Sequence, residues 1–161
     1  MNLPLQRKET RGARRKAREL SLQVLFQLDT GAKDQTPEEA FSLFCRSFDA
    51  PPEARNYAWE LVVGVRKHLN ALDAELNQAS EHWRLDRMSV VDRNILRLAL
   101  YEMRHLPDVP LKVSLNEAID LGKKYGTEES GAFINGVLDR IHHQLAGEAP
   151  SASETGDASE G

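Results

Sequence analysis

The first twenty residues hold the side chains with the clearest binding chemistry. Residues 1–20 contain seven Lys or Arg against two Glu, a local charge of +5, although the 161-residue chain has a net charge of -4. Cationic side chains bind polyanions by releasing counterions, so local charge matters more than the total. This segment therefore predicts a polyanionic partner.

Helical spacing places part of this cluster beside an aromatic residue. At ~100° per residue, four side chains share a face at the edge of the apolar stripe: Arg15, Arg18, Leu22 and Phe26. Guanidinium groups with an aromatic ring suit single-stranded RNA, in which phosphates and unpaired bases are both accessible. Alternatively, Leu22 and Phe26 pack against another helix and leave a solvated arginine cluster. Periodicity alone does not separate the two.

No arrangement of residues indicates catalysis or a cofactor. The sequence has no nucleophile elbow, Walker loop or dinucleotide-binding glycine motif. The five histidines form no metal-binding signature, and adjacent His142 and His143 point about 100° apart on a helix. Asp92 lies three residues after Ser89, which favours a helix cap over acid catalysis. We expect no enzymatic activity, cofactor or metal.

Composition points to the reducing interior of a cell. Cys45 is the sole cysteine, which excludes an intramolecular disulfide. No window has the apolar length of a signal peptide or a membrane helix. We therefore expect a cytoplasmic protein that does not associate with membranes.

Apolar periodicity predicts an all-α fold, a single domain of two packed three-helix sub-bundles. The first helix ends at Gly31, the second begins with a Thr36–Glu39 capping box, and the third covers residues 53–78 with Gly64 as a close contact or bend. The fourth begins at Ser89 and is apolar on nearly every side, the fifth covers residues 111–125, and Thr127 caps the sixth. Residues 13–146 form the predicted domain, between a flexible basic arm (1–12) and a disordered acidic tail (147–161).

Four segments, in this order and spacing, resemble the NusB family of bacterial transcription antitermination factors: residues 14–27, 92–103, 109–119 and 133–139. The first reads RRKARELSLQVLFQ, the second DRNILRLALYEM and the last FINGVLD; the third combines Val109-Pro110 with residues 116–119 (NEAI). The resemblance extends over roughly residues 14–141.

The resemblance implies an all-helical protein that binds boxA RNA of ribosomal RNA leader transcripts. It implies a heterodimer with the small-subunit ribosomal protein NusE, and assembly of an antitermination complex on RNA polymerase. The family's RNA contacts fall at the start of the first helix and of the last, here Arg14, Arg15, Lys16, Arg18, Phe26, Glu129 and Phe133. The family's partner-facing carboxylate corresponds to Asp92. Phe26 stands where the family often has Tyr, and Ala132 where some members have Lys.

Two other functions remain open from the sequence. NusB-like domains also form the N-terminal part of an RNA cytosine methyltransferase, although this chain has no segment for a methyl-donor domain. A helical protein-interaction domain without RNA function is the second, in which the basic end only improves solubility.

Overall fold

The computed structural model describes residues 11–47, 49–80 and 88–148. These residues form helices only: α2 (Arg11–Thr30), α3 (Pro37–Ser47), α4 (Pro52–Lys67), α5 (Leu69–Ala79), α6 (Val90–His105), α7 (Leu111–Tyr125) and α8 (Ser130–Glu148). The all-α prediction is confirmed. The predicted arm and tail lie mostly outside the described residues, apart from residues 11–12 and 147–148, which are helical.

The sequence predicts the cap of α3 correctly but not the cap of α8. Thr36 and Glu39 form the predicted capping box, with the Glu39 N–H donating to Thr36 Oγ1 (3.1 Å) and the Thr36 N–H donating to Glu39 Oε1 (3.0 Å). The prediction that Thr127 caps the last helix is wrong. Helix α8 begins three residues later, and the Ser130 hydroxyl instead accepts the Thr127 N–H (2.8 Å).

The third predicted helix divides into α4 and α5 at His68, not at Gly64. Gly64 is buried where a Cβ atom would collide with the Tyr101 ring, so it is a close-packing point. The His68 ring stacks on His105 at a centroid distance of 4.1 Å, and His105 in turn stacks on Tyr101 at 5.0 Å. These contacts with α6 accompany the break in the helix.

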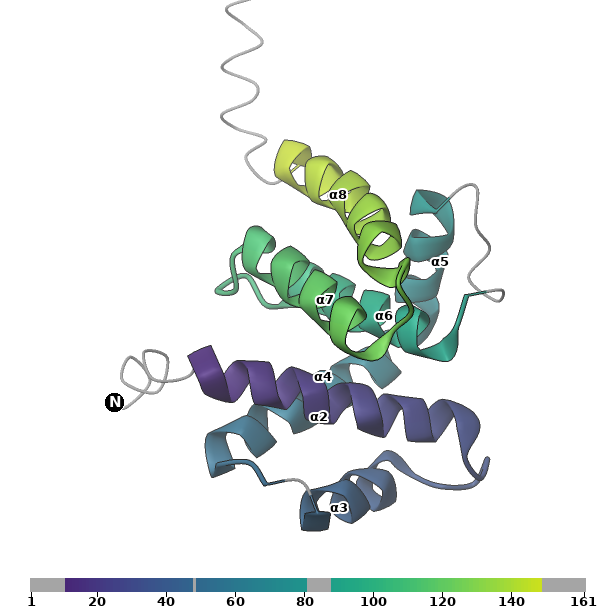
Figure 1. The fold of residues 1–161 in the computed structure, drawn as a ribbon, viewed down its shortest axis with the longest axis vertical. Coiled ribbons are helices and arrows are strands. Elements are labelled where there is room, and N and C mark those ends of the chain that lie inside the picture. Colours follow the sequence, from purple (N-terminus) through teal and green to yellow (C-terminus); the bar gives the residue numbers. More distant parts are fainter. Residues whose placement is uncertain (1–10, 48, 81–87, 149–161) are drawn as a thin grey trace, which may run out of the picture.

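Helix α6 is the central element, as predicted. Every residue from Asn94 to Met103 is buried, and the helix packs against α2, α4, α5, α7 and α8. Helices α2, α3 and α4 lie on one side, and α5, α7 and α8 gather with α6 on the other (Figure 1). Within the described residues the first sub-bundle therefore contains three helices, as predicted, and the second contains four, because the break at His68 places α5 in the second.

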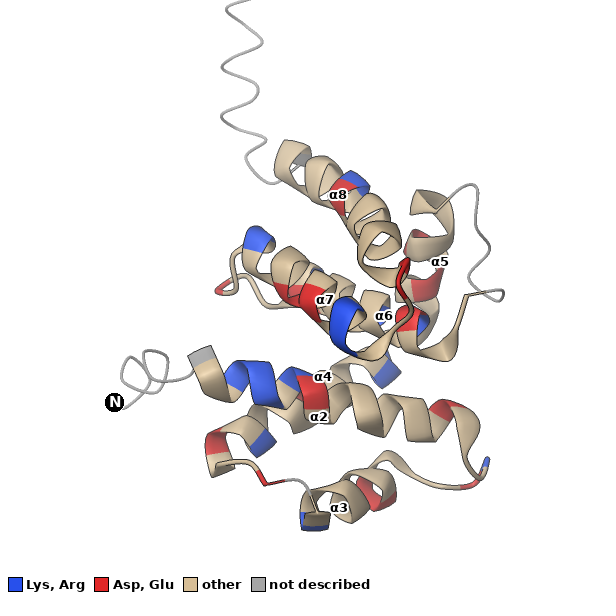
Figure 2. Ribbon diagram, viewed as in Figure 1, with Lys and Arg blue, Asp and Glu red and all other residues tan. Residues whose placement is uncertain are grey.

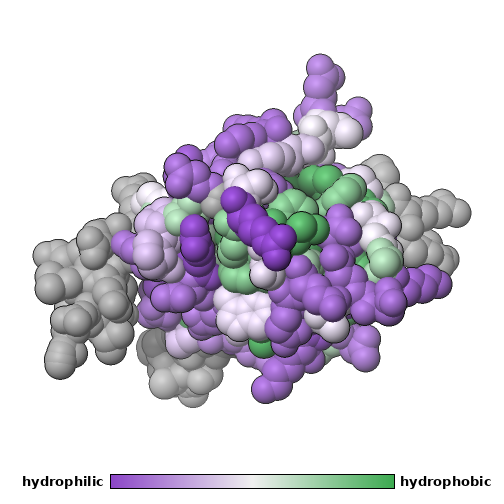
Figure 3. All heavy atoms as spheres, turned by 90° about the horizontal axis from the view of Figure 1, so that it is seen from below, coloured by the Kyte–Doolittle hydropathy of each residue, from purple (hydrophilic) through white to green (hydrophobic). Residues whose placement is uncertain are grey.

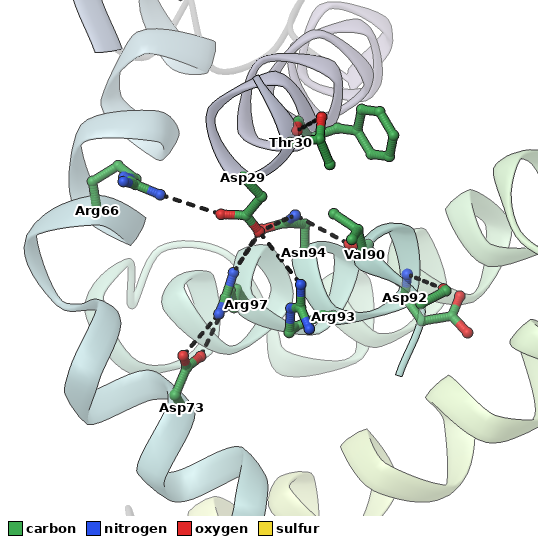
Figure 4. Close-up of polar contacts among 11 residues, drawn as sticks. Asp29, Thr30, Arg66, Asp73, Val90, Asp92, Arg93, Asn94 and Arg97 are labelled. Atoms are coloured by element: carbon green, nitrogen blue, oxygen red, sulfur yellow. Dashed lines mark hydrogen bonds and ion pairs between the residues drawn. The ribbon is translucent and has the colours of Figure 1, made fainter. Parts of the chain in front are cut away.

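A polar cluster around Asp29 joins the end of α2 to three other helices (Figure 4). Asp29 Oδ2 accepts from Asn94 Nδ2 and from Arg97 Nη1, both at 3.0 Å. The other nitrogens of Arg97 donate to the two carboxylate oxygens of Asp73 on α5, at 2.7 and 2.8 Å. Arg66 on α4 lies 3.5 Å from Asp29 Oδ1. Since Arg97 is buried, these paired carboxylates compensate its charge and fix the relative positions of α2, α5 and α6.

The underside of the molecule, over α3 and α4, exposes apolar side chains among polar ones (Figure 3). Leu43 is 50% exposed and Val63 40%. Phe41 of α3 packs on Trp59 of α4 at a centroid distance of 5.0 Å. This aromatic contact joins α3 to α4, and α3 also packs against α2, while Leu43 faces solvent.

Candidate nucleic-acid interface

The first turns of α2 present three of the predicted cations at the molecular surface. Blue segments at the start of α2 face red segments of α7 (Figure 2). The Arg15 side chain is 54% exposed and Lys16 is also exposed. Arg14 is 24% exposed, and its guanidinium lies 4.6 Å from the centre of the Tyr57 ring. Arg14, Arg15 and Lys16 therefore form the exposed cationic surface, which we call the α2 cluster.

Arg18 is not part of this surface, which corrects the sequence-based prediction. Its side chain is 6% exposed, and its Nε donates to Glu102 Oε2 at 2.9 Å. The hydroxyls of Tyr57 and Ser114 donate to the same carboxylate, at 2.5 and 2.8 Å. Arg18 thus binds a buried carboxylate of α6 and has no side available for a phosphate. We call these four residues the Glu102 network.

The pKa shifts follow from burial of the Glu102 network. Burial lowers the pKa of the Arg18 guanidinium, but Glu102, Tyr57 and Glu117 together raise it by more, so the net shift is upward. Burial and the same carboxylate raise the pKa of the Tyr57 phenol far above its ordinary value. Arg18 therefore stays charged and Tyr57 stays a hydrogen-bond donor over the whole physiological range of pH.

Leu22 and Phe26 have different environments. The packing alternative applies to Leu22, and the exposed-face alternative applies to Phe26. Leu22 is 3% exposed and belongs to the core, whereas Phe26 is 41% exposed. Phe26 lies eleven residues after Arg15, about 16 Å along the helix axis. An exposed aromatic residue remains on α2, but it is separate from the α2 cluster.

The start of α8 holds the other two predicted RNA contacts. Glu129 is exposed, and its carbonyl accepts the Phe133 N–H at 3.0 Å. Phe133 is half-buried against the core. A Cβ atom placed on the neighbouring Gly131 would lie 3.3 Å from Lys123 Cγ, so the lysine stem of α7 lies over this turn. The last turn of α7 and the start of α8 therefore form one continuous surface.

A set of paired charges between α2 and α7 was not predicted from the sequence. Arg15 donates to both Glu117 oxygens (3.1 and 2.9 Å) and to Asp120 Oδ2 (3.1 Å). Lys124 Nζ donates to Glu19 Oε2 at 2.7 Å. The hydrogen bond and charge of Glu117 raise the pKa of Arg15, and those of Glu19 raise the pKa of Lys124. The partners lie more than 100 residues apart, so no local sequence pattern reveals them.

Asp92, the predicted partner-facing carboxylate, lies at the start of α6. Its N–H donates to Ser89 Oγ at 3.0 Å, which confirms the cap on its backbone side. Figure 4 shows its carboxylate directed away from the Asp29 cluster. The side chain is largely buried, and its Oδ1 has no hydrogen-bond partner within the described part of the chain.

Two histidines of α8 come closer together than the helical angle predicts. The potential ligand atoms of Asp139, His142 and His143 lie within 4.8 Å of one another. His143 Nδ1 lies 2.8 Å from the Asp139 carbonyl oxygen and 3.6 Å from its carboxylate. Residues three and four positions after Asp139 lie on its side of the helix, so the three side chains share one face of α8.

The fold and this surface define a small all-helical protein with exposed basic side chains at the start of its first described helix. Residues 15–143 match the model of the NusB family. The transcription antitermination protein NusB of Desulfatibacillum aliphaticivorans is 50% identical over 137 residues, which cover 85% of this chain and 94% of that protein. The corresponding protein of Myxococcus xanthus is 48% identical over 132 residues, covering 81% and 94%. The chain belongs to the NusB family.

Solved structures agree with this assignment. A structure of T. maritima NusB aligns with a TM-score of 0.72 at 39% identity, over 80% of this chain and 89% of that one. A chain in a complex of the antitermination factors NusB and NusE with double-stranded RNA aligns with a TM-score of 0.74 at 29% identity, over 83% and 98%. In the described ranges, no helix has the length and hydrophobicity needed to cross a membrane.

Proposed function

We propose that this protein is a transcription antitermination factor that binds boxA RNA of ribosomal RNA leader transcripts together with NusE. The pair assembles an antitermination complex on RNA polymerase in the cytoplasm. The curated relatives are transcription antitermination proteins, a non-enzymatic function, so the protein is not an enzyme. This makes the methyltransferase alternative unsupported.

The observation that carries the proposal is the α2 cluster on a NusB-family fold. The exposed Arg15 guanidinium can exchange its carboxylate partners for a phosphate. A carboxylate and a phosphate each offer two oxygens that can accept both hydrogen bonds of the guanidinium fork. Arg14 and Lys16 add charge beside it. The interface that we propose consists of Arg14, Arg15, Lys16, Phe26, Glu129 and Phe133, with Arg18 as a buried support.

NusE is the proposed protein partner, and Asp92 is the proposed contact. The largely buried carboxylate with an unpartnered oxygen suits a donor supplied by another protein. Replacing Asp92 by Asn should therefore weaken the complex with NusE and spare RNA binding by the protein alone. If the wild-type and Asp92→Asn proteins bind NusE with equal affinity, Asp92 has its capping role only.

Binding of a boxA RNA, compared with a scrambled RNA of equal length, tests the RNA function and the role of Arg15. We expect Arg15→Ala to weaken binding to both RNAs. We also expect it to flatten the slope of log affinity against log salt by up to ~0.7 for a lost single-strand phosphate contact. Titrations at several salt concentrations, with single-stranded and duplex boxA and with and without NusE, measure this. No preference of the wild-type protein for boxA in any of these titrations would favour the protein-interaction alternative.

Phe26→Ala should behave differently from Arg15→Ala. If the exposed ring stacks on an unpaired base, its loss costs about 1–3 kcal/mol of binding free energy and leaves the salt slope almost unchanged. The matched control is Leu43→Ala, which also removes an exposed apolar side chain, on α3, and should spare RNA affinity. Melting temperatures of both variants show whether the fold is retained. Unchanged RNA affinity in a folded Phe26→Ala protein would remove Phe26 from the interface.

A further inference from the structure

A groove of about 480 Å³ lies between α2 and α7, next to the α2 cluster. Seven residues line it: Arg15, Glu19, Glu117, Asp120, Leu121, Lys123 and Lys124. The two helices are joined across it by side-chain ion pairs rather than by close backbone packing. Its walls can therefore rearrange by exchanging partners without moving the helices.

The groove contains three cations and three carboxylates, so its formal charge is zero. Arg15 is neutralised by Glu117 and Asp120, and Lys124 by Glu19. Lys123 is exposed and has no ion pair with another described residue within 4.0 Å. The groove thus has phosphate-binding groups that are mostly occupied by the protein's own carboxylates.

The carboxylates differ in how firmly they are held. Glu117 is only 14% exposed and also lies 3.7 Å from the buried Arg18, so it belongs partly to the interior. Asp120 is 52% exposed and has one ion pair, to Arg15 at 3.1 Å. An exposed pair of this kind is weak and readily exchanged. Asp120 is therefore the carboxylate that an incoming anion displaces most easily.

Lys123 connects the groove to the start of α8. Its stem lies over Gly131, between the predicted RNA contacts Glu129 and Phe133. A strand of RNA that follows the protein from the α2 cluster to α8 must pass the groove. This position gives the groove a specific ligand, the sugar–phosphate backbone.

We propose that the groove between α2 and α7 is a phosphodiester-binding subsite for RNA, whose cations Arg15 and Lys124 are masked by Asp120 and Glu19 in the free protein. Lys123 makes the first contact, and a phosphate then replaces Asp120 on Arg15. This inference rests on the proposed function, since it requires that RNA lies along this face.

The masking has a consequence for selectivity. A neutral groove attracts random polyanions weakly, because long-range attraction depends on net local charge. An RNA that is already held by Arg14 and Lys16 and at the start of α8 presents its phosphate to Arg15 at high effective concentration and can displace Asp120. Removing Asp120 should therefore improve binding to scrambled RNA more than binding to boxA, and so lower the selectivity between them.

The test compares substitutions in the groove with equal charge changes on α3, which lies on the far side of α2 from α7 (Figure 1). Asp120→Asn is paired with Glu38→Gln, and Lys123→Gln with Arg46→Gln; both control residues are exposed. We expect Asp120→Asn to tighten RNA binding about two- to fivefold at low salt, the range of exposed ion pairs, with a steeper salt dependence. Lys123→Gln should weaken binding and flatten the salt slope by up to ~0.7. The α3 controls should change neither quantity appreciably.

The outcomes separate this inference from the proposed function. If the wild-type protein prefers boxA but Asp120→Asn and Glu38→Gln change affinity equally, the effect is one of net charge and the subsite is rejected. A normal salt slope for Lys123→Gln rejects it as well. A wild-type protein that binds no RNA overturns both the proposed function and the subsite. Melting curves of all variants test whether the fold is retained. We expect that it is, because the substituted residues are exposed.

Discussion

Arg18→Met should lower the free energy of unfolding by about 3–5 kcal/mol, the cost of leaving a buried charge without its partner. Methionine keeps most of the side-chain volume, so little of this loss comes from a cavity. Glu102 is 2% exposed and would retain only the neutral donors Tyr57 and Ser114. Neutral donors compensate a buried carboxylate less well than a guanidinium does.

Denaturant unfolding of three variants checks this prediction. Arg15→Met is the matched control, an arginine that is 54% exposed on the same helix, and should cost less than about 1 kcal/mol. The double variant Arg18→Met/Glu102→Gln removes both charges and should be more stable than Arg18→Met alone. A double variant less stable than the single one would mean that packing, and not the unpaired charge, accounts for the loss.

This prediction also explains how a cation of the predicted RNA cluster supports the surface without touching RNA. Arg18 holds Glu102 of α6 and faces Glu117 of α7, the carboxylate that binds Arg15. The buried network and the exposed α2 cluster are therefore connected through Glu117. A loss of RNA binding in an Arg18 variant requires the stability control before it is assigned to a lost contact.

Local signals in the sequence were sufficient for most helices. The bounds of α7, at Leu111 and Tyr125, agree with the prediction because Pro110 precedes the helix and Gly126 follows it. The Thr36–Glu39 box works because both hydrogen bonds form within four residues. The α6 prediction follows from its apolar residues, which occur on nearly every side.

Contacts between distant segments could not be read from local patterns. Arg18 lies at the edge of the apolar stripe, where the helical angle allows either solvent or interior. Glu102, which decides between them, is 84 residues away. The break at His68 likewise involves stacking on His105 of another helix, whereas Gly64 has the local signature of a bend. In both cases tertiary contact overrides local preference.

For the candidate site, too, the sequence predicted only part of what the structure shows. Composition identified the basic start of α2, and the resemblance added the start of α8. The surface between them depends on Arg15 meeting Glu117 and on Lys124 meeting Glu19, pairs whose members lie on different helices. Lys123 and Lys124 by themselves are typical of the last turn of a helix, where cations favour the negative end of the helix dipole.

Leu98→Ala should lower the free energy of unfolding by about 2–5 kcal/mol, the range for large-to-small substitutions in a packed core. Leu98 is 2% exposed in the middle of α6, which both sub-bundles contact. A cavity there removes contacts that cannot reform, since neighbouring helices are held by the Asp29 cluster and the Glu102 network.

Leu43→Ala is the matched control for Leu98→Ala, because the side chain removed is the same but Leu43 is 50% exposed. We expect its cost to stay within about 0.5 kcal/mol, as for most surface substitutions. Denaturant midpoints with unchanged slopes measure both effects as changes in stability. If the two leucine variants lose equal stability, α6 is not the element on which the packing of the two sub-bundles depends. In that case the connection between the sub-bundles would depend chiefly on the polar networks, and Arg18→Met would be the more damaging substitution.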